Sequence, residues 1–214
     1  MSKLLIALCF AFLSLSLVQC QNPIDKINGD KKTYNYLTQS NLQTQSNSNS
    51  NIYKCSSISE YFQTVGQSES LSLSYSVLKH NYLYISFEYA FINVLGMSGG
   101  VTKQGQVDLN GNTLSFSTKV YSDDYNCMTR TDNTKVDGKS QATFVLAHSG
   151  SVDLKFYSDN IASFARFGVS NLTITAYYCG VNAELSSKTL TCVCKSGYKE
   201  TIVQYSNLKF KECQ

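Results

Sequence analysis

The stretch Arg166–Cys179 reads Arg-Phe-Gly-Val-Ser-Asn-Leu-Thr-Ile-Thr-Ala-Tyr-Tyr-Cys, and it is the segment that best indicates the fold of the chain. From Leu172 onward its apolar residues mostly occupy every second position, with threonine between them. This period of two predicts a β-strand with one face toward a core. Further cysteines follow at Cys192 and Cys194. The stretch therefore predicts the end of a β-domain and the start of a small tail held by disulfides.

Alternating runs of the same kind precede this stretch. They are Leu71–Val77, Tyr82–Val94, Lys103–Leu109, Thr113–Tyr121, Gln141–Ala147 and Val152–Tyr157. The pair Asn110-Gly111 separates two of these runs and favours a tight hairpin, because both residues tolerate positive φ. No segment shows a convincing helical pattern. About seven or eight strands joined by turns predict an all-β chain, folded as an antiparallel β-sandwich of jelly-roll type.

The run Tyr82–Val94 is more continuously apolar than the others. It predicts either a central strand buried on both faces or a strand with a bulge near Tyr89. The segment Ser122–Lys139, in contrast, is polar and predicts a long loop that contains Cys127.

Residues 1–20 have the pattern of a secretory signal peptide. Lys3 supplies the positive charge, an apolar run follows, and cleavage is expected after Cys20. The tetrapeptide Leu17–Cys20 faintly resembles a bacterial lipoprotein box, an alternative that Gln19 disfavours. We therefore expect a secreted, extracellular protein, with association at the cell surface through a partner as a further expectation.

The charge of the chain excludes some partners. Loss of Lys3 with the signal lowers the formal net charge from +3 to +2. A chain this close to neutral lacks the basic stripe that nucleic acids require, so no nucleic-acid partner is expected. No later apolar run approaches about 20 residues, so we expect no transmembrane segment in the mature chain.

Composition predicts the domain boundaries. Residues 21–51 are rich in Gln, Asn, Ser and Thr and predict a flexible polar arm, since such a segment buries too little apolar area to offset its ordering entropy. Residues 52–178 are assigned to the β-sandwich and residues 179–214 to the cysteine tail.

Three disulfides are expected, because six cysteines remain after Cys9 and Cys20 leave with the signal. Sequence alone leaves many pairings open. The preferred pairing separates domain from tail: Cys55–Cys127, Cys179–Cys192 and Cys194–Cys213. The sequon Asn171-Leu172-Thr173 predicts glycosylation of Asn171, provided that this residue faces solvent.

Two motifs suggest chemistry that their surroundings do not support. Gly96-Met97-Ser98-Gly99-Gly100 matches the nucleophile elbow of hydrolases, but no helical pattern follows it. Asp108-Leu109-Asn110-Gly111-Asn112 begins like a calcium loop, yet the glycine and the terminal acid of such loops are absent. We interpret the first as a glycine-rich loop and the second as a hairpin turn, and we expect no catalytic residue.

The remaining candidates are loop acids and histidines. Asp123 and Asp124 lie beside Cys127 in an oxygen-rich loop that could hold Ca²⁺, although solvated loop acids are the preferred interpretation, and no cofactor is expected. His80 and His148 are the two histidines of the chain. We predict that both have structural roles, in capping or packing.

The tail resembles half of a known module. Cys192-Val193-Cys194-Lys195-Ser196-Gly197-Tyr198 fits the Cys-x-Cys-x-x-Gly-aromatic pattern of the second half of an EGF-like module. A glycine there permits a tight turn. The tail is therefore predicted to be a partial EGF-like module that adds stability.

The chain as a whole resembles the amino-terminal β-domain of ciliate secreted and cell-surface proteins that carry furin-like or EGF-like cysteine repeats. The similar segments are Leu78–Phe87, Val107–Gly111, Asn126-Cys127, Ala147–Ser149, Phe167–Leu172 and Cys179. The resemblance spans roughly residues 70 to 198 and implies a galactose-binding-like sandwich at the cell surface. The chain departs from that family at Asn93–Gly96, where an Asp-Ser-Trp segment is often found, and it contains no tryptophan.

These features lead to three functional hypotheses. The first is a secreted or cell-surface, non-catalytic recognition module whose partner is a glycan or an extracellular protein. The second is a structural component of an extracellular coat or matrix. The third, a secreted hydrolase acting through Ser98, is disfavoured.

Overall fold

The computed structural model describes residues 24–46, 51–55, 59–95, 101–120, 135–159, 161–205 and 208–214. These residues form two compact units. The larger unit is Lys31–Ala176, and the smaller is Tyr177–Gln214 together with the N-terminal residues up to Asp30. The division after Ala176 lies close to the predicted boundary at residue 178. The predicted signal peptide, residues 1–20, lies outside the described residues.

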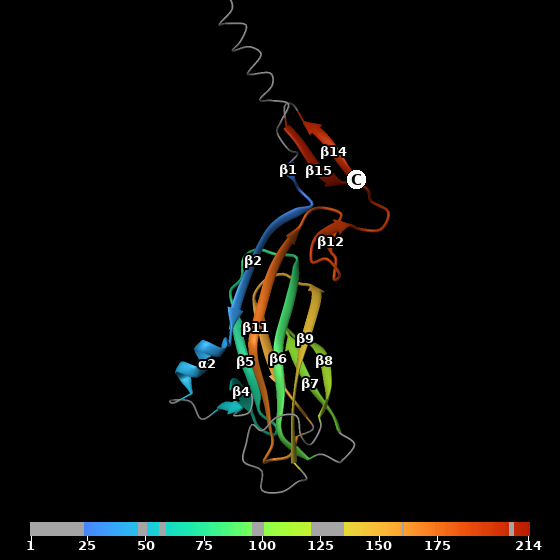
Figure 1. The fold of residues 1–214 in the computed structure, drawn as a ribbon. Helices are drawn as coiled ribbons and strands as arrows, with labels where there is room; N and C mark the ends of the chain where they lie inside the picture. The colour runs from blue at the N-terminus through green and yellow to red at the C-terminus, as the bar shows by residue number, and fades with distance from the viewer. Residues whose placement is uncertain are drawn as a thin grey trace, which may run out of the picture. The chain divides into compact units, whose positions relative to one another are not determined.

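The larger unit is a sandwich of two antiparallel sheets (Figure 1). Its main strands are β3 (Ile52–Cys55), β4 (Glu60–Val65), β5 (Ser70–Tyr75), β6 (Tyr82–Leu95), β7 (Val101–Leu109), β8 (Asn112–Val120), β9 (Lys135–Ala147), β10 (Val152–Tyr157) and β11 (Arg166–Cys179). One sheet has the order β5-β10-β7-β8 and the other β3-β4-β11-β6-β9. Each strand predicted from the sequence is present.

The path of the chain between the sheets is that of a jelly roll. From β4 to β11 the chain alternates between the sheets, except that β7 and β8 are consecutive in the four-stranded sheet. The resulting layers, β4-β11-β6-β9 and β5-β10-β7-β8, reproduce the eight-stranded order of two Greek keys. The predicted fold class is therefore confirmed.

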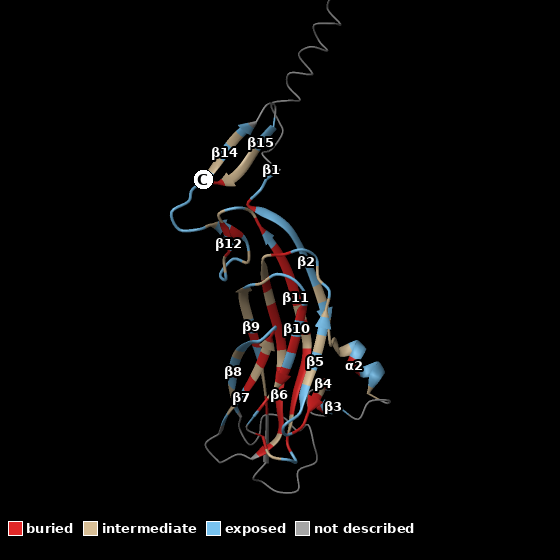
Figure 2. Cartoon of the chain, turned by 180° about the vertical axis from the view of Figure 1, so that it is seen from behind, coloured by how far each residue is buried: buried red, intermediate tan, exposed pale blue. Residues whose placement is uncertain are grey.

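The core lies between the two sheets, where Figure 2 shows the buried segments in red. Both sheets contribute to it through every second residue. Leu83, Ile85 and Phe87 of β6 are completely buried, as is Phe156 of β10. The ring of Phe87 meets that of Phe156 edge-on, with 4.9 Å between centroids. Aromatic pairs of this kind add to the stabilisation from area burial.

Bulges in the two central strands, β6 and β11, change which residues of each strand face the core. In β6 the register with β9 shifts between Phe91 and Val94, and Asn93 between them has a φ of 58°. Ala90 and Ile92 are also buried, in a second cluster with Phe62. The two sequence-based alternatives thus both hold in part: β6 is buried on both faces here, and its bulge lies beyond Tyr89.

Strand β11 has a similar irregularity at Asn171, whose φ is 48°. Phe167 and Val169 before it, and Leu172 and Ile174 after it, all belong to the core. A strand alternates faces strictly, so the change from odd to even core positions requires one extra residue, as in a β-bulge.

The prediction of a flexible arm over residues 21–51 is wrong for most of its described part. Asn28–Tyr36 form strand β2, which pairs with β11, and Gln39–Gln45 form the helix α2. Leu42 of α2 is only 1% exposed, and the ring of Tyr36 stacks 3.7 Å from that of Tyr75. A few well-placed apolar side chains anchor the segment, and its polar composition does not reveal them. The predicted loop is also too long, because β9 begins at Lys135.

The smaller unit consists of short strands and two disulfides. Strands β1 (Ile24–Asp25), β15 (Leu208–Cys213) and β14 (Glu200–Tyr205) form one sheet, and β12 (Ala183–Leu185) pairs with β13 (Cys192–Cys194). Cys179 is bonded to Cys192 and Cys194 to Cys213, as predicted. Cys55 of the larger unit is also disulfide-bonded. Its predicted partner, Cys127, lies outside the described residues.

Leu83→Ala should lower the free energy of unfolding by about 3–5 kcal/mol, because it leaves a cavity in a closed core. Leu78→Ala is a matched control, since Leu78 is 48% exposed where Leu83 is fully buried. The control should cost less than about 1 kcal/mol. Urea unfolding monitored by tyrosine fluorescence measures both, and equal losses would contradict the assignment of the core.

Peptide mapping of the unreduced protein should yield the linked pairs Cys179–Cys192 and Cys194–Cys213. Their Cα–Cα distances of 5.5 and 5.4 Å fall within the range that a disulfide spans without backbone movement. The same digest tests the predicted bond between Cys55 and Cys127. A fragment that joins Cys192 to Cys213 would contradict the structure of the smaller unit.

Candidate functional site

Polar side chains cover the outer face of the four-stranded sheet. Val152, Leu154 and Phe156 of β10 point into the core, so Asp153 and Lys155 between them point outward. The other strands alternate in the same way. The outward residues are Ser70, Ser72, Ser74, Gln104, Gln106, Asp108, Thr113, Ser115, Ser117, Asp153, Lys155 and Tyr157.

The register of the strands places these side chains in rows. Lys155 lies opposite Ser72 on β5 and opposite Asp108 on β7. Asp108 in turn lies opposite Thr113 on β8. A polar row therefore crosses all four strands, and directly opposed side chains in such a row are about 5 Å apart.

Two open depressions follow this face and share Lys155. One has a volume of about 270 Å³ and is lined by residues that include Ser72, Ser74, Asp108 and Asp153. The other has a volume of about 390 Å³ and includes Tyr157. We call the surface formed by Ser72, Ser74, Asp108, Asp153, Lys155 and Tyr157 the outer-face site.

The acids of the outer-face site are held in place, whereas its lysine has no salt bridge to any residue that the structure describes. Asp108 Oδ1 accepts a hydrogen bond of 2.7 Å from the Gly111 N–H, and Asp153 Oδ2 accepts one of 3.2 Å from the Ser151 hydroxyl. Each carboxylate keeps further lone pairs for a ligand. Among the described residues, Lys155 forms no ion pair, and its ammonium lies 5.7 Å from the centroid of the Tyr157 ring. The site therefore offers fixed acceptors beside a donor and an aromatic ring.

A histidine pair joins the turns at one end of the strands that form this face. His80 Nε2 lies 2.9 Å from His148 Nδ1, and His148 Nε2 lies 3.3 Å from Asn110 Oδ1. His80 Nδ1 lies 2.7 Å from the Leu78 carbonyl oxygen, and the His80 side chain is buried. Both histidines thus have hydrogen-bonded structural positions, in agreement with the prediction. Neither the pairing of the two nor its link to Asn110 could be read from their spacing in the sequence.

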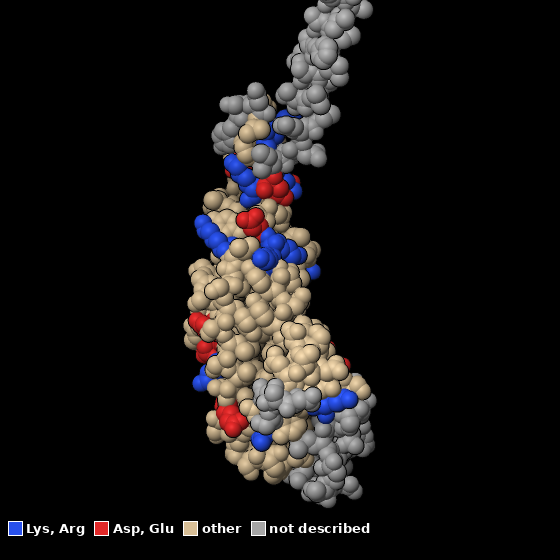
Figure 3. Space-filling view, turned by 90° about the vertical axis from the view of Figure 1, so that its left-hand side faces the viewer, with Lys and Arg blue, Asp and Glu red and all other residues tan. Residues whose placement is uncertain are grey.

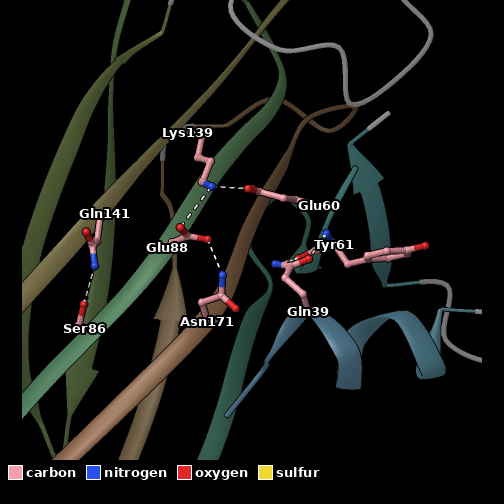
Figure 4. Close-up of polar contacts among 8 residues, drawn as sticks. All are labelled: Gln39, Glu60, Tyr61, Ser86, Glu88, Lys139, Gln141 and Asn171. Carbon is pink, nitrogen blue, oxygen red and sulfur yellow. Dashed lines mark hydrogen bonds and ion pairs between the residues drawn. The ribbon is translucent and has the colours of Figure 1, made fainter. Parts of the chain in front are cut away.

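A charged cluster occupies the outer face of the other sheet (Figure 4). Lys139 of β9 forms ion pairs with Glu60 of β4 and Glu88 of β6, at 2.5 and 3.2 Å. Burial opposes the charge of Lys139, but the hydrogen bond to Glu60 and the charge of Glu88 outweigh this effect and raise its pKa. Asn171 of β11 completes the cluster by donating from Nδ2 to Glu88 Oε2 at 2.7 Å. We call these four residues the lysine cluster, and it links four strands of one sheet.

Two neighbouring contacts in Figure 4 extend this polar face. Gln141 Nε2 donates to Ser86 Oγ at 2.9 Å. Gln39 of α2 accepts from the Tyr61 N–H at 2.6 Å and donates to the Tyr61 carbonyl at 3.2 Å. The Gln39 amide thus pairs with the backbone of β4 as a neighbouring strand would, which fixes the helix against the sheet.

The predicted glycosylation site coincides with the lysine cluster. Asn171 Nδ2, the atom that would carry a glycan, is the atom that donates to Glu88. Asn171 is also half-buried, at a bulge. Glycosylation of Asn171 stays a prediction, and it competes with this contact.

The other sequence-based candidates fall in two groups. Asp123, Asp124 and Ser98 lie outside the described residues. Asn110 and Gly111 form the predicted hairpin turn, with φ values of 50° and 87°. Among the described residues, no group of three or more His, Cys, Asp or Glu side chains could hold a metal ion. Within the same residues, no helix is both long and apolar enough to span a membrane.

Few charges mark the surface. Only 15% of the residues are charged, well below the share of about 25% in typical domains. Figure 3 shows one face on which a broad stretch carries no Lys, Arg, Asp or Glu side chain. Such a surface is poorly suited to partners that bind mainly by charge.

Comparison with known proteins gives little guidance. No family model and no curated protein matches the chain. Dimeric latent PorU from Porphyromonas gingivalis is similar at 12% identity and a TM-score of 0.46, over 74% of this chain and 14% of PorU. The Agl-KA catalytic domain is similar at 12% identity and a TM-score of 0.34, over 76% of this chain and 28% of that one.

The chain thus spans less than a third of either protein's length. Similarities this distant carry no inference about its activity. The resemblance to the ciliate family stays a prediction.

Lys139→Met should destabilise the larger unit by about 1–3 kcal/mol, since it leaves two carboxylates without their shared cation. Adding Glu88→Gln should recover part of the loss, which a double-mutant cycle would show. Lys155→Met is the matched control and should have little effect, because Lys155 is exposed and forms no ion pair within the described part of the chain. An equal loss in the control would contradict a role for the cluster.

The raised pKa of Lys139 also predicts a pH dependence. The stabilisation should be complete below the ordinary lysine pKa of about 10.4 and should be lost as the pH rises through the raised value. Urea unfolding between about pH 9 and pH 11.5 should show this loss in the wild type and a smaller one in Lys139→Met.

Proposed function

We propose that this chain is a secreted, non-catalytic module that binds a neutral glycan at the outer-face site. The observation that carries the proposal is the polar row formed by Ser72, Lys155, Asp108 and Thr113 across the four-stranded sheet. Its side chains stand on paired strands, so the donors and acceptors are already arranged before a ligand arrives. Such preorganisation lowers the entropic cost of binding.

The chemistry of the site matches that of sugar hydroxyls. Asp108 and Asp153 can each accept from adjacent hydroxyls, and Lys155 can donate to a ring or hydroxyl oxygen. Tyr157 lines the same surface and has an apolar ring on which the C–H face of a sugar can pack. The mixture of acids with one lysine gives no advantage to a strongly anionic ligand, which supports a neutral one.

The compartment supports a glycan partner. The two disulfides of the smaller unit are typical of secreted proteins. Secretion through residues 1–20, association with a cell surface and a divergent EGF-like origin of the tail all belong to this proposal. Gly197 has a φ of 89°, as the glycine of that module's tight turn requires. Tyr198, the aromatic residue of the same pattern, is 44% exposed.

One observation favours a second candidate, a component of an extracellular coat. Most of the exposed large apolar side chains in the described residues belong to the smaller unit. They are Tyr178, Val181, Val193, Tyr198, Ile202 and Leu208. Exposed apolar groups of this kind suit self-association better than they suit sugar binding.

A glycan array followed by titration calorimetry tests the proposal. The wild type should bind at least one neutral glycan, and Lys155→Met and Asp108→Asn should each weaken binding about tenfold or more, the loss expected for one charged hydrogen bond. Lys188→Met, which removes an exposed lysine of the smaller unit, should bind normally. Binding that EDTA abolishes would instead implicate Asp123 and Asp124 in the loop predicted from the sequence.

The two candidates give opposite results. Absence of binding on the array, together with self-association that grows with protein concentration, would replace the glycan proposal with the coat. Normal glycan binding by Lys155→Met and Asp108→Asn would keep a binding function but move it away from the outer-face site.

A further inference from the structure

The two imidazole rings of the histidine pair point directly at each other. His80 Nε2 and His148 Nδ1 are 2.9 Å apart, while the ring centroids are 5.2 Å apart. That centroid distance is as large as two imidazoles can reach at this N···N separation, so both nitrogens lie on the line between the centroids. The ring planes differ by only 6°. The rings are therefore coplanar and in line, which is the geometry of a hydrogen bond.

Each outer nitrogen of the pair faces a fixed acceptor. His80 Nδ1 faces the Leu78 carbonyl oxygen, and His148 Nε2 faces Asn110 Oδ1. The Asn110 amide cannot present its nitrogen instead, because its oxygen accepts from the Asp153 N–H at 3.0 Å and its nitrogen donates to the Ser151 carbonyl at 3.0 Å. Both outer contacts therefore call for an N–H group on the histidine.

The protons of a neutral pair do not suffice for these contacts. Two neutral imidazoles carry two N–H groups, whereas the two outer contacts and the inner one each need one. In any neutral arrangement, two lone pairs face each other somewhere in the chain of contacts. One added proton satisfies all three contacts. A second added proton would place two N–H groups face to face at the inner contact and break it.

We propose that His80 and His148 form a proton-sharing pair that takes up one proton while closed, and that a second proton opens it. A metal ion fits the geometry poorly. Bound to both nitrogens along their common line at about 2.0–2.1 Å each, it would need them about 4 Å apart, and they are 2.9 Å apart.

The surrounding charges agree with two separate steps. Burial and, next, the positive charge of His80 lower the pKa of His148, while Asp153 of β10 raises it. The part of this lowering that comes from the charge of His80 applies to a proton that arrives when the pair is already charged. Lys79, which precedes His80 and lines the same depression, adds a further positive charge near the pair. Asp108 of β7 is the other acid on this face, and its carboxylate accepts a hydrogen bond from the Gly111 N–H.

The linkage has a defined sign. A histidine pKa that is lower in the folded than in the unfolded state destabilises the fold as the pH falls below the unfolded value of about 6.5. The closed pair should therefore be stable near neutral pH and open in acid.

Opening the pair would release the turn that carries Asn110 and so would affect the outer-face site. The pair connects three turns: the β5–β6 segment through Leu78 and His80, the β9–β10 turn through His148, and the β7–β8 turn through Asn110. Asn110 also lines the smaller depression of the outer-face site. This consequence rests on the proposed glycan function, whereas the proton-sharing pair itself does not.

Nitrogen NMR of the intact protein labelled with ¹⁵N-histidine tests the pair directly, because the chain has no histidines besides these two. Between pH 8 and pH 5 the pair should take up one proton, with a nitrogen–nitrogen coupling across the inner contact. Two independent histidines would take up nearly two protons over this range. Uptake of two protons, or no coupling at any pH, would overturn the proposal.

A variant separates the acid response from general loss of stability. In His148→Asn, the amide nitrogen can still donate to His80 Nε2 but does not titrate. If this variant folds, the fall in urea midpoint from pH 7 to pH 5 should shrink relative to the wild type. An unchanged fall would contradict the second step. If it does not fold, the NMR result on the wild type decides alone.

Glycan affinity then tests the link to function. Because the second proton enters below pH 5, the best glycan from the array should bind at least tenfold more weakly at pH 4 than at pH 6 in the wild type, with a smaller change in His148→Asn. Equal affinity at both pH values would reject the link between the pair and the site. Absence of glycan binding at every pH would reject the proposed function and leave the NMR test of the pair intact.

Discussion

The bulge at Asn171 is the feature on which much of the larger unit depends. Without the extra residue, β11 could not turn both Phe167 and Leu172 toward the core, and one half of the strand would present polar residues to it. The same bulge directs the Asn171 amide to the outer face, where it holds Glu88. Through Glu88 and Lys139 the effect extends to β6, β9 and β4. A single backbone irregularity thus serves the core on one face and a polar network on the other.

The two outer faces of the sandwich differ in what they leave for a ligand. On the sheet that contains β4, β11 and β6, the charged groups near Asn171 bind one another, and helix α2 is fixed against β4 through Gln39. On the four-stranded sheet, the acids are fixed by neighbouring turns while Lys155 forms no ion pair with any described residue. Polar groups that the fold holds in position, but whose hydrogen-bonding capacity is not fully used within the fold, are the ones available to bind a ligand.

The amino-acid sequence predicted those features that depend on local periodicity. The alternation around Leu154 and Leu73 placed strands correctly, and Asn110-Gly111 marked the hairpin. The arm was misjudged because Leu42 and Tyr36 are isolated in a polar segment, and burial of isolated residues depends on partners far along the chain. The outer-face site was missed for a related reason. Alternation indicated that Lys155 faces outward, but only the strand register brings Asp108 beside it.

The smaller unit is built from both ends of the described chain. Ile24 pairs with Phe210, and the Ile27 carbonyl accepts from the Gly180 N–H, so residues that precede the larger unit in the chain bind residues that follow it. Contacts between such distant residues form slowly, because a large loop must close before they can. During synthesis β1 must wait until β15 has emerged, and by then the residues of the larger unit have already emerged. The order of synthesis therefore makes the smaller unit assemble after the larger one, and a chain shortened before β15 would leave β1 unpaired.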